Sequence, residues 1–167
     1  MTHIVVSPLS RLAAQIALHR PSHILSLSSS DLPSMPSAAT RLSLTFNDIV
    51  EPREGLVMPD DSHVHQILAF ARDWGRSKPM LIHCYAGVSR STASAYIMAL
   101  ALNPALDEVT LAQKLRKLSP SATPNIRLIA LADQILARNG RMIEAIRAIG
   151  RGKDAFEGEV FSLPVAG

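Results

Sequence analysis

The segment 80–91 constrains the fold of this chain more than any other part of the sequence. It begins with a short apolar run, Met80-Leu81-Ile82, and reaches the only cysteine of the protein at position 84. A turn of small residues follows, and a run of helix-forming residues begins just after Arg90. The pattern predicts a buried strand, a tight loop and a buried helix, with the thiol of Cys84 at the carboxyl end of the strand.

A loop of this kind is suited to binding an anion. Its backbone N–H groups can converge on one centre, and the following helix directs the positive end of its dipole toward the same point. Gly87 permits backbone conformations that a Cβ atom would hinder. Arg90 supplies a planar guanidinium that can bind two phosphate oxygens at once. The segment therefore predicts a cradle for a dianion, with a thiol at its base.

Composition excludes several other classes of protein. The 167 residues are 47% hydrophobic and 4% aromatic, which suits one globular domain with a mainly aliphatic core. The net charge of +3 suits anionic ligands. No basic block or aromatic platform accompanies that charge, so we expect no nucleic-acid partner. We expect no membrane span and no signal peptide, and the lone free thiol favours the cytoplasm.

Apolar patterns along the chain predict an α/β fold with a small central, mostly parallel sheet flanked by helices, and a helix-rich C-terminal half. The predicted strands are 4–6, 23–27, 42–46 and 80–83. The predicted helices are 9–19, 61–74, 91–102, 107–118, 125–138 and 142–149. The segment 50–61 is expected to be a long surface loop. Residues 1–150 are the single predicted domain, and 151–167 are expected to be a weakly ordered tail.

The stretch from His83 to Ser91 reads His-Cys-Tyr-Ala-Gly-Val-Ser-Arg-Ser. It resembles the H-C-x-x-G-x-x-R-[S/T] loop of the protein tyrosine phosphatase superfamily, and the helix after it is similar to that of the dual-specificity branch. The resemblance extends to Phe46-Asn47-Asp48 and to 121–125, and it covers roughly residues 40–136. It implies the fold and the chemistry of a cysteine-dependent phosphatase.

The resemblance assigns roles to the residues of this loop. Cys84 is the nucleophile and forms a phosphocysteine intermediate. Ser91 hydrogen-bonds the sulfur and helps it leave when the intermediate is hydrolysed. The phosphate is bound by backbone amides and one guanidinium, from Tyr85, Ala86, Gly87, Val88, Ser89 and Arg90. His83 orients the loop and Asn125 braces it. No cofactor and no metal ion are expected.

The leaving group needs a proton donor, and the resemblance points to Asp48 at the end of a predicted strand. The interval between Asp48 and Cys84 is a few residues longer than expected for the small enzymes of that branch. The extra length falls in the segment 50–61. Glu51, Asp60 and Asp61 therefore remain alternatives as the general acid.

The expected substrate is a phosphorylated protein or a small phosphate ester, with phosphotyrosine first and phosphoserine or phosphothreonine as further candidates. A phosphatase of lipid or small-molecule phosphate esters is the main alternative. Branches that act on inositol phospholipids often carry lysines inside the loop, whereas Tyr85, Ala86, Val88 and Ser89 carry no charge. A non-catalytic phosphate-binding module is a further alternative, although inactive relatives usually lack the cysteine or the arginine.

Overall fold

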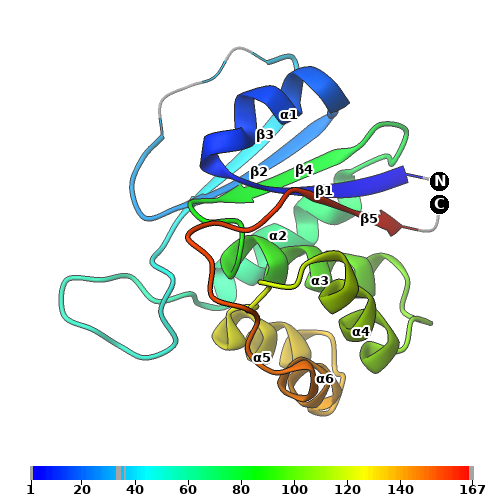
Figure 1. The fold of residues 1–167 in the computed structure, drawn as a ribbon. Helices are drawn as coiled ribbons and strands as arrows, with labels where there is room; N and C mark the ends of the chain where they lie inside the picture. The colour runs from blue at the N-terminus through cyan, green and yellow to red at the C-terminus, as the bar shows by residue number, and fades with distance from the viewer. Residues whose placement is uncertain (1, 33–34, 36, 166–167) are drawn as a thin grey trace.

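The computed structural model describes residues 2–32, 35 and 37–165 (Figure 1). The strands are β1 (Thr2–Pro8), β2 (His23–Ser28), β3 (Thr40–Thr45), β4 (Met80–Cys84) and β5 (Phe161–Val165). The helices are the short 3-10 helix η1 (Leu9–Arg11) and α1 (Leu12–His19), α2 (Asp61–Asp73), α3 (Arg90–Leu102), α4 (Glu108–Leu118), α5 (Ile126–Ile135) and α6 (Arg141–Ile149).

The strands form one sheet with the order β3-β2-β4-β1-β5. Four strands are parallel, and β5 alone is antiparallel to its neighbour β1. β4 is buried along its whole length between β1 and β2, as its continuous apolar sequence requires. The carboxyl ends of the parallel strands meet at one edge of the sheet, so the segments that follow β1, β2, β3 and β4 gather there.

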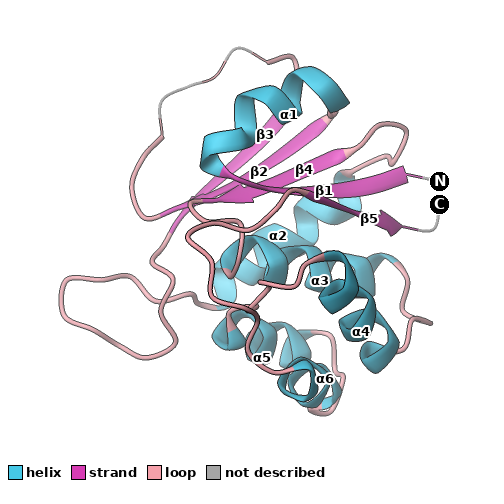
Figure 2. Cartoon of the chain, in the orientation of Figure 1, coloured by secondary structure: helices cyan, strands magenta, loops and turns pink. Residues whose placement is uncertain are grey.

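Helices cover both faces of the sheet (Figure 2). η1 and α1 lie on one face, where Leu12 packs on Val5 and Ile24. α2 to α6 lie on the other face. There the alternate residues Ile4 and Val6 of β1 join the main core. The strand residues alternate between the two faces, which is the period of two expected for a covered sheet.

The predicted fold class is confirmed, because the sheet is mostly parallel, helices flank it and the second half of the chain is mainly helical. α3 is buried from Arg90 to Leu100, which fits its nearly continuous apolar sequence. None of the helices within residues 2–32 and 37–165 combines the length and the apolar character needed to cross a membrane.

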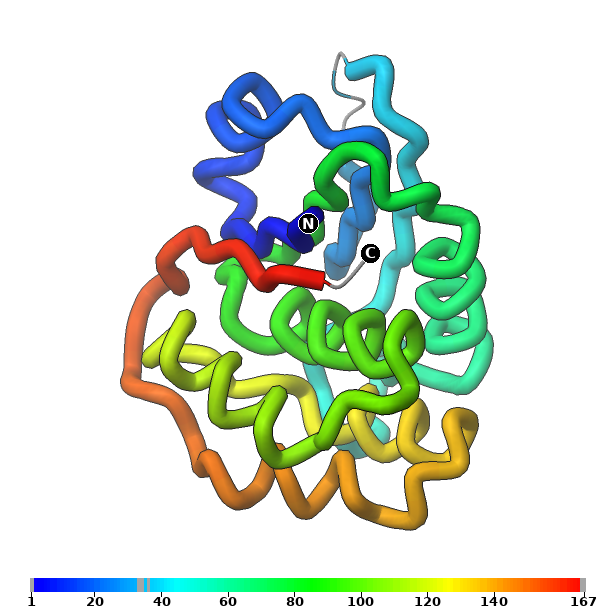
Figure 3. Tube along the Cα trace, turned by 90° about the vertical axis from the view of Figure 1, so that its right-hand side faces the viewer, coloured from blue at the N-terminus to red at the C-terminus, as the bar shows by residue number. Residues whose placement is uncertain are grey.

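The prediction of a weakly ordered tail after residue 150 is wrong for Phe161–Val165. These residues form β5, which pairs with β1 from Thr2↔Val165 to Val6↔Phe161. Phe161, Leu163 and Val165 point into the core. Figure 3 shows the chain returning from α6 to the sheet, so that β5 lies beside the N-terminal strand. Residues 166–167 of the predicted tail lie outside the described residues.

Candidate active site

The loop 85–89 connects β4 to α3 and turns around the thiol of Cys84, which is 3% exposed. The Gly87 N–H donates to Cys84 Sγ over 3.3 Å. Ser91 Oγ lies 3.1 Å from the same sulfur. Both groups can donate to a thiolate, and the N-terminus of α3 adds the positive end of a helix dipole. The sulfur therefore has two hydrogen-bond donors beside it and the N-terminus of a helix next to it.

The carbonyl groups of Tyr85, Ala86 and Val88 lie on the outer side of this loop and accept hydrogen bonds from other segments. The pairs are Leu9 N to Tyr85 O (3.1 Å), Gly158 N to Ala86 O (2.7 Å) and Thr123 N to Val88 O (2.9 Å). In a trans peptide the C=O and the following N–H point in opposite directions. Holding the carbonyls outward therefore turns the next N–H groups inward, and the bond from Gly87 N–H to the sulfur shows this direction.

Arg90 is 6% exposed and is fixed by one end of its guanidinium. Its Nη1 donates to Phe46 O over 2.8 Å and to Ser29 Oγ over 3.1 Å. Its Nε is buried and has no hydrogen-bond partner among the described residues. A buried N–H without a partner costs free energy, and a positively charged one costs more. This donor is therefore placed for an anionic ligand.

A cavity of about 400 Å³ lies over the thiol and the guanidinium. Arg90 is the one cationic side chain of fixed charge that lines it within the described residues. Its wall is formed by the end of β2 and the segment after it, by η1 and by the cysteine loop. The lining residues are Leu9, Leu27, Ser28, Ser29, Ser30, Leu32, His83, Cys84, Tyr85 and Arg90. The cavity suits a phosphate bound at the loop and an uncharged organic group beside it.

Asp48 lies against the cysteine loop, on the side of Ser89. Ser89 Oγ donates to Asp48 Oδ1 over 2.7 Å, and Asn125 Nδ2 donates to the same oxygen over 2.8 Å. These bonds hold Oδ1, and no hydrogen bond to Oδ2 is found among the described residues. Asp48 does not line the cavity over Cys84 but a neighbouring hollow of about 250 Å³, which Ser89 lines as well.

The alternative acids are placed differently. Asp60 is the N-cap of α2, and its carboxylate accepts bonds from the backbone N–H groups of Ser62 and His63. The side-chain hydrogen bond from Ser62 lowers the pKa of Asp60 below its usual value, which disfavours the protonated form that a general acid needs. Asp61 is the exposed first residue of α2, and Glu51 is exposed in the loop before it.

Asn125 connects the cysteine loop with the segment that carries Asp48. Its backbone N–H donates to Ser89 O over 3.2 Å. Its Oδ1 accepts from Leu128 N as the N-cap of α5, and its Nδ2 also reaches Ile49 O. The motif in the sequence indicated a brace for the loop, but nothing in the sequence indicated the bond from Asn125 to Asp48.

His83 belongs to a buried chain of polar side chains that the sequence did not reveal. Arg41 Nε donates to Ser26 Oγ over 2.8 Å, and Ser26 Oγ lies 2.6 Å from His83 Nε2. This hydrogen bond joins the Ser26 hydroxyl to Nε2, while Nδ1 is buried and has no hydrogen-bond partner among the described residues. Burial, and to a lesser extent the charge of Arg41, lower the pKa of His83 to about 4. His83 is therefore neutral at physiological pH.

This shift predicts a loss of stability in acid. The folded protein keeps His83 neutral down to about pH 4, whereas an unfolded histidine takes up a proton near pH 6.5. The stability that His83 contributes is thus complete above pH 6.5 and is lost as the pH falls to 4. We expect the wild-type free energy of unfolding to fall by about 3 kcal/mol more than that of His83→Gln between pH 7 and pH 4. Urea unfolding at both pH values measures this difference, and equal losses in the two proteins would contradict it.

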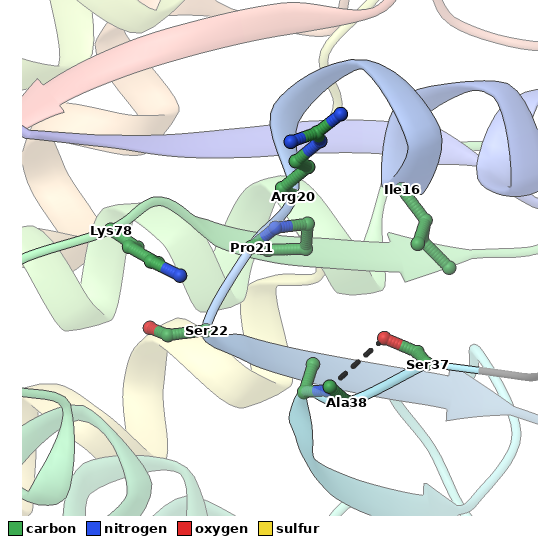
Figure 4. A pocket seen from close by; sticks show the side chains of 8 residues that line it. Ile16, Arg20, Pro21, Ser22, Ser37, Ala38 and Lys78 are labelled. Carbon is green, nitrogen blue, oxygen red and sulfur yellow. Dashed lines mark hydrogen bonds between the residues drawn. The ribbon is translucent and has the colours of Figure 1, made fainter.

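A separate hollow of about 490 Å³ lies at the opposite edge of the sheet, where β2, β3 and β4 begin (Figure 4). Its polar lining includes Arg20, Lys78, Ser22 and Ser37. Arg20 caps the C-terminus of α1, where a cation stabilises the helix dipole. None of its described lining residues also lines the cavity over Cys84. The described residues also contain no group of three or more His, Cys, Asp or Glu side chains able to hold a metal ion.

No family model matches the chain, and no curated protein matches it in sequence. Solved structures do match. DUSP15 superposes with a TM-score of 0.64 and 17% identity, covering 92% of this chain and 99% of that chain. PTPMT1 in complex with PI(5)P gives a TM-score of 0.62 and 10% identity over 81% of this chain and 90% of that chain. OH1 from the Orf virus is described as a tyrosine phosphatase with triple substrate specificity. It superposes with a TM-score of 0.61 and 19% identity, covering 82% of this chain and 84% of that chain.

These likenesses establish the fold. The chain has the α/β fold of the protein tyrosine phosphatase superfamily, in the form taken by dual-specificity phosphatases. The resemblance that the cysteine loop indicated is thereby confirmed at the level of the fold.

Proposed function

We propose that this protein is a cysteine-dependent phosphatase that hydrolyses phosphate monoesters, phosphotyrosine first, through a phosphocysteine intermediate. The observation that carries the proposal is that one cavity is lined both by Cys84 and by Arg90, whose buried Nε has no hydrogen-bond partner among the described residues. This reaction requires a thiol that accepts a hydrogen bond from a backbone N–H, and a guanidinium with a donor free to bind phosphate.

In the first step, the Cys84 thiolate attacks phosphorus while the bond from phosphorus to the leaving oxygen breaks. The amides of 85–90 and the Arg90 guanidinium bind the remaining phosphate oxygens as charge develops on them. Asp48 gives the proton on Oδ2 to the leaving oxygen. The products are a phosphocysteine and a neutral alcohol or phenol.

In the second step, water attacks phosphorus and the bond from phosphorus to sulfur breaks. The Asp48 carboxylate accepts a proton from that water. Ser91 Oγ lies 3.1 Å from the sulfur, and its hydroxyl can donate a hydrogen bond to the thiolate as it leaves. Inorganic phosphate is released and the thiolate is restored. The reaction needs a free thiol, which suits a reducing compartment such as the cytoplasm.

The cavity favours a substrate with one phosphate and an uncharged organic group. Leu9, Leu27 and Leu32 lie in its wall, and Arg90 is its cation of fixed charge in the described part of the chain. A phosphotyrosine ring can lie against such a surface, and a second phosphate would find no further cation there. A lipid or small-molecule ester is the second candidate, favoured by the likeness to PTPMT1 in complex with PI(5)P.

A substrate panel separates these candidates. We expect hydrolysis of an aryl phosphate and of phosphotyrosine peptides in the presence of a chelator, at rates well above those for inositol phosphates. Faster hydrolysis of inositol phospholipids would favour the second candidate. Stoichiometric binding of a phosphotyrosine peptide without release of phosphate would favour a non-catalytic module.

The role of Asp48 can be tested by its dependence on the leaving group. We expect Asp48→Asn to lower kcat for phenyl phosphate by about 10²- to 10⁴-fold. The loss should be much smaller for an aryl phosphate whose phenol is strongly acidic, because that phenolate leaves without a proton. Steady-state kinetics on a series of aryl phosphates measures this difference.

Asp60→Asn is the matched control for Asp48→Asn. Asp60 caps α2, and asparagine is as good an N-cap as aspartate, so this replacement should leave both the helix and the dependence on the leaving group unchanged. If Asp60→Asn creates that dependence and Asp48→Asn does not, the assignment of the acid is wrong.

A further inference from the structure

The segment 150–160, here called the C-terminal strap, passes along the outside of the cysteine loop on its way from α6 to β5 (Figure 3). It has no helix or strand of its own, but hydrogen bonds attach it at several points. These are Gly152 N to Thr123 Oγ1 (3.1 Å), Lys153 N to Pro120 O (2.9 Å), Ser10 Oγ to Glu157 Oε2 (2.7 Å) and Gly158 N to Ala86 O (2.7 Å). The strap is therefore fixed to segments that themselves contact the loop.

Arg116 anchors the start of the strap. Its Nη2 donates to Gly150 O over 2.7 Å, and its Nη1 donates to Ala122 O over 2.8 Å. The same guanidinium thus joins the strap to the segment whose Thr123 N–H supports Val88 O. The strap and this segment form one continuous support along the outer side of the loop.

Gly158 brings the strap into close contact with the peptide between Ala86 and Gly87. A Cβ atom at position 158 would lie 2.8 Å from Gly87 O and 3.3 Å from Ser121 Oγ. The backbone of Gly158 is not in the left-handed region, so the conformation itself does not require glycine. Glycine is needed here for space, because any side chain would push the strap away from the loop.

The bond from Gly158 has a direct consequence for the sulfur. It holds Ala86 O on the outer side of the loop, and the N–H of the same peptide unit belongs to Gly87. That N–H points inward and donates to Cys84 Sγ. A peptide unit turns as a plane, so releasing the outer carbonyl also releases the inner N–H.

We propose that the C-terminal strap is a positioning element for the reaction and that Gly158 is its positioning residue. By fixing the peptide of Ala86 and Gly87, the strap keeps one amide donor on the Cys84 sulfur and on the bound phosphate. The catalytic significance of this arrangement rests on the proposed phosphatase function. The expected effects on the thiolate and on anion binding follow from the geometry alone.

The test uses the full chain and compares Gly158→Ala with two controls. Gly75→Ala places a methyl group in open space at the end of α2. Phe156→Ala removes a side chain of the strap that is 83% exposed. Two readouts need no turnover: the rate of Cys84 alkylation by iodoacetamide against pH, and the concentration of inorganic phosphate that protects Cys84 from alkylation.

For Gly158→Ala we expect the midpoint of the alkylation profile to move to higher pH. We also expect protection to require roughly 10- to 100-fold more phosphate, as follows from a weakened hydrogen bond to a charged group. Both controls should match the wild type. A Gly158→Ala protein that folds and matches the wild type in both readouts would overturn the proposal.

Ser10→Ala keeps the proposal testable if Gly158→Ala does not fold. It removes the exposed bond to Glu157 and leaves the backbone contacts intact, so we expect a smaller shift in the same direction. No shift in Ser10→Ala would then overturn the proposal. A wild-type protein without phosphatase activity would contradict the proposed function, but the two readouts would remain valid. An active wild type whose variants are unaffected would contradict only the positioning role of the C-terminal strap.

Discussion

Replacing Cys84 with serine will lower the turnover of an aryl phosphate by on the order of 10⁵-fold, the scale seen when a nucleophile is removed from an enzyme. The site is arranged to hold a thiolate, with one backbone N–H and the Ser91 hydroxyl at the sulfur. A serine hydroxyl stays protonated in the same place, because no base among the described residues hydrogen-bonds this position to take its proton.

The same variant should still bind phosphate. The amides of the loop and the guanidinium of Arg90 are unchanged by Cys84→Ser, so the affinity for inorganic phosphate or for a phosphotyrosine peptide should fall by less than about tenfold. Loss of turnover together with retained phosphate binding is the result expected when only the nucleophile has been removed. A Cys84→Ser protein with full activity would show that the chemistry occurs elsewhere.

Replacing Arg90 with lysine will produce the second large effect, a loss of about 10³-fold in kcat/KM. Arg90 makes two kinds of contact at once: Nη1 binds Phe46 O and Ser29 Oγ, and Nε is left for the ligand. A single ammonium group cannot make both sets of contacts in one plane. The variant must therefore lose either the bonds to Phe46 and Ser29 or the bond to phosphate.

Kinetics with phosphate as a competitive inhibitor measures this loss. We expect KM and the inhibition constant of phosphate to rise while kcat falls, because the guanidinium binds both the ground state and the transition state. A conservative change on the protein surface, Arg72→Lys, provides the control. An Arg90→Lys protein within tenfold of the wild type would mean that the unpartnered Nε serves no ligand.

The central part of the fold and site could be predicted because its signals are local. An apolar run, a small-residue turn and helix formers specify a strand, a loop and a helix, and β4 and α3 have these positions. The spacing of Cys84, Gly87 and Arg90 is contained in seven consecutive residues. Local sequence is therefore enough to place the thiol, the turn and the guanidinium around one centre.

The parts that could not be predicted depend on contacts between distant segments. β5 contains Pro164, which argues against a strand, but β5 is an edge strand where proline is tolerated. Gly158 gave no sign in the sequence that it would lie against the cysteine loop. The chain from Arg41 through Ser26 to His83 joins three strands, so it exists only after the sheet has formed.

The position of Asp48 could be predicted only in part. A motif at the end of a strand identified it, but its placement depends on Ser89 and Asn125, which reach it from two other parts of the chain. Its rival Asp60 has a common local signature, an N-cap before a helix, and the structure places it in that role.

The most direct test of the account is to trap the covalent intermediate. Rapid acid quench of the wild-type protein with an excess of aryl phosphate, followed by peptide mass spectrometry, should find one phosphoryl group on Cys84 and none in Cys84→Ser. A phosphoryl group on another residue, or turnover with no phosphorylated Cys84 at any time, would contradict the proposed mechanism.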